Sequence, residues 1–272
     1  MPKYKFTYTA LLLILLGFCQ EINAQRPDRS QTQKASTALW LGSYANFRLS
    51  KKLFWAGELH YRRQEHNNIP FLGRDGQIYN RHGIKYLFNS NLSTTVGGVL
   101  RLNFTPEPGN ENLRTLVLEP RIWYEFVFAM PAINRFRIYH RIRIEHRWNR
   151  SNKIGADFTF RNRFRYKFYM KIPINNPKLI PGTFYFSPDV ELIMQSGKTV
   201  VDSPLEDLRL FPHVGYIASP KLAYSLGIMY TTGQTLDAGY EYRARWIIRA
   251  NVYISLDFRK FKEKIPEINI MD

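Results

Sequence analysis

Hydrophobic and polar side chains alternate with a period of two along most of this chain, and no other feature of the sequence constrains its fold as strongly. From Arg135 to Trp148 the even positions carry Phe, Ile, His and Trp, whereas the odd positions are mostly Arg. The runs 158–170 and 240–258 repeat the pattern. Successive side chains of a strand point to opposite faces. Each run is therefore predicted to be a strand with one apolar and one charged face.

Weaker copies of the same alternation occupy much of the remaining chain. Turn residues such as Asn89-Ser90-Asn91 and Ser219-Pro220-Lys221 separate them. The sequence indicates about eleven strands, most longer than the five or six residues usual in soluble sheets. The further strands are expected at 38–48, 53–65, 77–88, 92–104, 116–128, 184–194, 208–218 and 222–233.

The first residues have the layout of a secretory signal peptide. Lys3 and Lys5 precede an apolar core from Ala10 to Phe18, and the small residue Ala24 follows a short polar stretch. This core is too short to span a membrane as a helix. We expect residues 1–24 to be a signal peptide, and its cleavage removes Cys19, the single cysteine of the chain.

Long alternating strands behind a signal peptide are typical of a transmembrane antiparallel β-barrel. Only a closed sheet satisfies every backbone hydrogen bond in lipid. We therefore predict an all-β chain in the outer membrane of a Gram-negative bacterium, with an N-terminal extension at 25–36, the barrel at 37–258 and a periplasmic tail at 259–272. A soluble secreted all-β protein is the alternative.

Bacterial single-chain barrels have even strand numbers, so twelve strands are predicted, with ten as the alternative. Connections near 49–52, 89–91, 129–134 and 219–221 are short and expected in the periplasm. Under this rule the first and last strands both run toward the periplasm, so either one strand is missed or residues 25–36 pass through the lumen. Longer, external connections are expected near 66–76, 105–112, 149–156, 196–206 and 234–239.

Several segments resemble an uncharacterised family of outer-membrane barrels, filed as domain of unknown function 2490, from Bacteroidetes-type bacteria. They are Leu39-Trp40-Leu41-Gly42, the segment from Glu58 to Arg63 and the strand from Tyr139 to Arg147. The resemblance covers about 38–258 and rests on loose strand patterns. It implies a barrel without an assigned activity and transfers no functional residues.

If even positions between 78 and 258 face lipid, the odd positions line the lumen. The formal net charge is +17, so this lumen is expected to be basic. Arginine and carboxylate side chains then either pair across a narrow, rigid barrel or form a path for a small anionic solute. The predicted lumen charge network consists of Glu119, Arg121, Glu125, Arg137, Arg141, Arg143, Glu145, Arg161, Arg163, Arg165, Asp189, Glu191, Glu241, Arg243 and Arg245.

The chain is predicted to be a porin-like, transport-related or structural protein and not an enzyme. The alternative is a hydrolase of lipids or lipid A, with a Ser–His pair at the barrel rim. His140 and His146 lie about 20 Å apart along one strand and cannot form a joint site. The complete histidine supply is His60, His66, His82, His140, His146 and His213.

No cofactor or metal site is predicted, since the mature chain lacks cysteine and has no HExxH motif. Asp202, Glu206 and Asp207 are a weak calcium candidate in a loop. Nucleic acid is excluded as a partner because the chain is exported. The expected partners are outer-membrane lipids, the barrel-assembly machinery, a small anionic solute, and lipopolysaccharide bound at a basic rim. Candidate rim residues are Arg62, Arg63, Arg74, Arg147 and Arg150.

Overall fold

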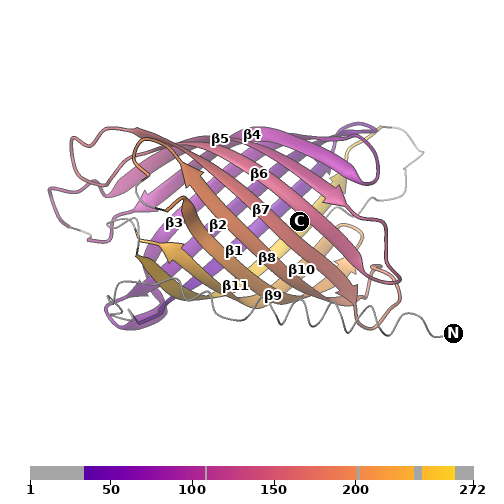
Figure 1. The fold of residues 1–272 in the computed structure, drawn as a ribbon. Coiled ribbons are helices and arrows are strands. Elements are labelled where there is room, and N and C mark those ends of the chain that lie inside the picture. The colour runs from indigo at the N-terminus through magenta and orange to yellow at the C-terminus, as the bar shows by residue number, and fades with distance from the viewer. Residues whose placement is uncertain (1–33, 108, 201–202, 236–240, 261–272) are drawn as a thin grey trace. The chain divides into compact units, whose positions relative to one another are not determined.

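The computed structural model describes residues 34–107, 109–200, 203–235 and 241–260, which form a closed barrel of eleven strands (Figure 1). The predicted signal peptide and most of the predicted N-terminal extension and C-terminal tail lie outside the described residues. The strands are β1 (Ser36–Arg48), β2 (Leu53–His66), β3 (Ile69–Leu87), β4 (Leu92–Phe104), β5 (Leu116–Ala129), β6 (Arg137–Asn149), β7 (Thr159–Pro173), β8 (Phe184–Ser196), β9 (Leu205–Ser219), β10 (Leu222–Gln234) and β11 (Tyr242–Asp257).

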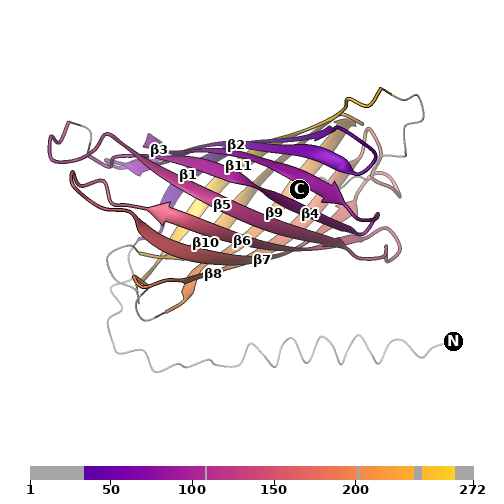
Figure 2. The same ribbon diagram turned by 90° about the horizontal axis from the view of Figure 1, so that it is seen from above.

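The all-β barrel predicted from the alternation is confirmed, and its strands cross the barrel obliquely (Figure 2). Neighbours in the sequence pair in antiparallel fashion from β1 through β11. In the part of the chain that the structure describes, no helix is long and apolar enough to cross a membrane.

The barrel closes through a parallel pair between β1 and β11. Its register runs from Ser36 opposite Arg245 to Arg48 opposite Asp257. Around a closed ring, strands can alternate in direction throughout only if their number is even. The prediction of twelve strands is therefore wrong: the described residues form eleven, and one parallel pair accommodates the odd number. The parallel pair also explains why the first and last strands run in the same direction, although no strand is missing between them.

The long connection predicted near 66–76 is a tight hairpin. Asn67 and Asn68, with φ of 49° and 61°, join β2 directly to β3. Positive φ at both central residues is typical of a type I′ turn, and asparagine tolerates this conformation better than most residues. The polar segment after the turn therefore continues as strand and does not form a loop.

Odd-numbered side chains face the interior on β3 through β11, except at the start of β9, where a register shift turns Glu206 inward. On β5, for example, burial alternates along the strand, with Trp123 and Val127 almost fully buried. On β1 and β2 the even positions face inward, including Trp40 and Tyr44. The parity changes at the β2–β3 and β1–β11 pairs, where each even residue lies opposite an odd one, as Glu58 does opposite Arg81. Opposite residues point to the same face, so even positions on β1 and β2 share the inner face with odd positions on β3 and β11.

The outward positions carry large apolar side chains that remain exposed. On β5 these are Ile122, Tyr124, Phe126 and Phe128, each about 40% exposed. The same holds for Phe160 and Phe164 on β7. A monomeric soluble protein rarely exposes so continuous an apolar surface.

Glycines on the inner surface make room for large side chains opposite them. A Cβ atom on Gly83 would lie 3.0 Å from the Trp123 ring, and one on Gly215 would overlap Tyr185. Gly97 lies so close to β3 that an added Cβ would overlap the backbone oxygen of His82. At these positions aromatic rings therefore lie directly against the backbone.

We predict that Gly97→Ala destabilises the barrel by about 1–3 kcal/mol, because β3 must move to admit the methyl group. Gly98→Ala is the matched control: its Cβ would meet only the Arg121 carbonyl oxygen, at 3.9 Å. We expect it to change stability by less than about 0.5 kcal/mol. Urea unfolding of both variants, refolded in detergent micelles and followed by tryptophan fluorescence, measures the difference. Equal midpoints for the two variants would show that β3 and β4 are not packed this closely.

Candidate functional site

Glu145 on β6 is the centre of a charged layer inside the barrel. Its side chain is fully buried. Four guanidinium groups from β3, β5 and β7 surround its carboxylate. The nitrogen–oxygen distances are 2.7 Å to Arg121, 2.9 Å to Arg165, 3.2 Å to Arg81 and 3.5 Å to Arg163.

The other inward carboxylates extend this layer around and across the lumen. Glu58 on β2 contacts Arg143 on β6 at 3.0 Å and also pairs with Arg81. Since β2 and β6 are not neighbours in the sheet, these side chains reach across the interior. The remaining ion pairs include Glu119 with Arg101, Arg121 and Arg147, Glu125 with Arg143, Glu191 with Arg141, Arg165 and Arg209, Glu206 with Arg147 and Arg163, and Asp189 with Lys167.

Buried tyrosines form a second layer, toward the end that carries the β5–β6 and β7–β8 connections. Tyr139 and Tyr169 stack with ring centroids 4.8 Å apart, and Tyr44 and Tyr253 stack at 5.1 Å. Tyr185 completes this tyrosine layer, in which every member is at most 8% exposed. Together with the charged layer, these rings fill much of the cross-section.

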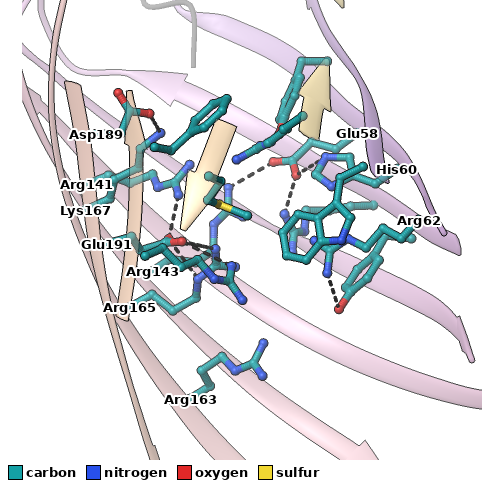
Figure 3. Close-up of a pocket in the computed structure, with 18 of the residues that line it drawn as sticks. Glu58, His60, Arg62, Arg141, Arg143, Arg163, Arg165, Lys167, Asp189 and Glu191 are labelled. Atoms are coloured by element: carbon teal, nitrogen blue, oxygen red, sulfur yellow. Dashed lines mark hydrogen bonds and ion pairs between the residues drawn. The ribbon is translucent and has the colours of Figure 1, made fainter. Parts of the chain in front are cut away.

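A cavity remains between the two layers, lined by side chains from β1, β2, β3 and from β6 through β11 (Figure 3). Its volume is about 50 Å³, enough for a few water molecules or a small ion. Nine arginine and lysine side chains line it, against three carboxylates, and four carboxylates outside the lining also pair with some of these arginines, so positive charge stays in excess: Glu125, Glu145, Glu206 and Asp207. The cavity therefore favours negative charge. The lining carboxylates are Glu58, Asp189 and Glu191.

Most of the residues predicted for the lumen charge network come together in the charged layer. Five of the predicted set lie elsewhere. Arg137 and Arg243 are exposed, and Glu241 is exposed in the β10–β11 connection. Arg161 bonds to Thr199 and Gln195, and Arg245 bonds to Ser36; among the described residues, neither has a carboxylate partner.

The predicted lumen network did not include Glu58, His60 and Arg62, because the parity rule was applied only from residue 78 onward and β2 follows the opposite parity. The signal was present locally, since these three charged or polar residues occupy successive even positions. Arg62 and Arg147, predicted for an outer rim, lie inside the barrel.

Two of the three candidate calcium ligands form ion pairs with arginines. Glu206 binds the arginines of the charged layer, and Asp207 pairs with Arg209 at 2.6 Å. Asp202 lies outside the described residues. Among the residues that the structure describes, no three His, Cys, Asp or Glu side chains gather as a metal site requires.

The histidines are distributed over both faces of the barrel. His140 bonds to the Tyr166 hydroxyl at 2.7 Å and His146 to the Asn162 amide oxygen at 2.6 Å, both on the outer face. Inside, Ser187 donates to Asp189 at 2.8 Å, and His213 lies 3.9 Å from the same carboxylate. In a catalytic triad the histidine lies between the serine and the acid. Here Ser187 and His213 are opposite each other on β8 and β9, but Ser187 donates directly to the acid, and no hydrogen bond joins it to His213 among the described residues.

A family model described as a protein of unknown function, DUF2490, matches residues 37–242. The chain belongs to this family. The matched residues run from the second residue of β1 to the first residue of β11. They include all of the charged layer. No curated protein matches the chain.

We predict that Glu145→Gln lowers the free energy of unfolding by about 3–5 kcal/mol, because four buried arginines lose their shared negative charge. The measurement is urea unfolding in detergent micelles; urea is chosen because guanidinium chloride would screen the ion pairs. Glu241→Gln, the same change at an exposed position, is the control and should shift stability by less than about 0.5 kcal/mol. Equal effects of the two substitutions would mean that the charged layer does not hold the barrel together.

Proposed function

We propose that this DUF2490 protein is an outer-membrane β-barrel of a Gram-negative bacterium that takes a small anionic solute into a closed lumen. The observation that carries this proposal is the cavity between the charged layer and the tyrosine layer, with its excess of cationic side chains. The function is transport-related and non-enzymatic.

The outer surface supports the membrane location. Long strands with exposed aromatic and aliphatic side chains on one face, closed without a free edge, suit a lipid environment. A soluble protein would need a partner to cover this surface. Outer-membrane lipids are accordingly the proposed surroundings, and insertion is proposed to depend on the barrel-assembly machinery.

The filled interior supports solute binding over free diffusion. A wide pore keeps an aqueous channel along its axis, whereas here two layers of buried side chains occupy the lumen. Arginine and lysine around the remaining space lower the electrostatic cost of admitting an anion. The hydrolase alternative would require His213 to move between Ser187 and Asp189.

We predict that the refolded mature chain carries almost no steady current in a planar bilayer, because the tyrosine layer and the charged layer together fill the lumen. The double variant Tyr139→Ala/Tyr169→Ala removes two rings of the tyrosine layer, so it should conduct measurably more than the unmodified chain. Under a tenfold salt gradient the reversal potential should have the sign of anion selectivity, up to a limit of about 59 mV.

The control for this experiment removes two outward rings, Tyr124→Ala/Phe128→Ala, and should stay silent. Large currents through the unmodified barrel, or cation selectivity of the opened one, would contradict the proposal. Cell fractionation tests the location independently: recovery in the soluble fraction without detergent would contradict an outer-membrane protein.

A further inference from the structure

The two walls of the cavity differ in how their positive charges are balanced. On one wall, the lining cations belong to β6 and β7 and their carboxylate partners to β8. Arg141, Arg165 and Lys167 each pair with Asp189 or Glu191. On the opposite wall, Arg62 of β2 and Arg249 of β11 line the same cavity. Within the described part of the chain, neither forms an ion pair with a carboxylate.

Arg62 is held rigidly between two aromatic rings. Its guanidinium carbon lies 3.6 Å from the centroid of the Trp40 ring and 4.3 Å from that of Tyr79. Its Nη1 donates only two long hydrogen bonds, of 3.4 Å each, to Gln77 and the Tyr79 hydroxyl. Its Nε is buried without an acceptor. Stacking leaves the edges of the guanidinium plane as its only hydrogen-bonding direction.

Among the described residues, the direct contacts of Arg249 are with neutral groups. It donates to the Tyr44 hydroxyl and, at 3.3 Å, to the amide oxygen of Asn251, and it lies 4.9 Å above the Phe211 ring. A buried cation surrounded by neutral partners is costly unless a counter-charge is supplied. Two lining carboxylates, Asp189 and Glu191, act on Arg249 only at longer range, since among the described residues they form ion pairs with other cations: Lys167, Arg141, Arg165 and Arg209.

We propose that Arg62 and Arg249 form a binding site for a small oxyanion, such as a phosphate or carboxylate group, inside the lumen. The inference deepens the proposed function, on which it rests, by naming the solute's chemistry and the residues that select it. A fixed guanidinium fork matches the paired oxygens of an oxyanion and not a spherical halide. Trp40, Tyr44, Tyr79 and Phe211 form the walls that hold both arginines in place.

The test is isothermal titration calorimetry of the refolded mature chain in detergent micelles at constant potassium chloride. Inorganic phosphate and acetate are titrated separately, which distinguishes a phosphate site from a carboxylate site. Saturable binding of at least one of them is expected. Arg62→Gln and Arg249→Gln should each weaken it about tenfold or more, because each removes a charge-assisted hydrogen-bond donor.

Arg161→Gln is the matched control, since Arg161 forms no ion pair with a carboxylate of the described residues and does not line the cavity. It should bind like the unmodified chain. Arg62→Lys keeps the charge but loses the planar fork, so it should bind more weakly than the unmodified chain. If Arg62→Gln fails to fold, Arg62→Lys and Arg249→Gln still provide the test. Folding is checked by the change in electrophoretic mobility of each variant on heating.

Absence of saturable binding by either anion would overturn the site, as would equal binding by Arg62→Gln and Arg161→Gln. The measurement needs neither a membrane nor a current, so it separates the two proposals. A barrel that conducts freely but binds phosphate would keep the site and contradict the closed lumen. A silent outer-membrane barrel that binds neither anion would keep the closed lumen and contradict the site.

Discussion

Charge buried inside a closed sheet has to find a partner inside the same sheet, and this constraint governs the architecture of the lumen. Isolated ions in a protein interior cost several kcal/mol each, even after relaxation. The barrel meets this cost by distributing single carboxylates among several arginines, most completely at Glu145. Because the arginines come from strands that are not all neighbours, the same contacts that neutralise charge also tie opposite walls together.

Much of the fold could be predicted from the alternation alone, because the side-chain period of a strand is visible in any sequence. The inner face of β3 through β11 follows from it directly, as Trp123 and Glu145 illustrate. The strand number could not be derived in this way. The even-number rule assumes that every pair is antiparallel, and the sequence does not show that β1 meets β11 in parallel.

The candidate site was predicted only in part, for a related reason. Whether an even or odd residue faces inward depends on the register of each strand pair, which is set by turn geometry. The Asn67-Asn68 turn and the irregular register beside it reverse the parity on β2. A parity rule that holds from residue 78 onward therefore cannot be extended to Glu58, His60 and Arg62, which line the cavity from β2.

The parallel seam also bears on the order in which the barrel can form. Hairpin pairs bring together residues close in sequence, but the bond between Arg245 and Ser36 spans 209 residues. Closing so long a loop costs entropy before any contact repays it, and pairings of this kind form slowly. Until the last strand arrives, β1 keeps an unpaired edge along its whole length. The parallel β1–β11 pair is therefore the one contact that turns an open sheet with two free edges into a closed barrel.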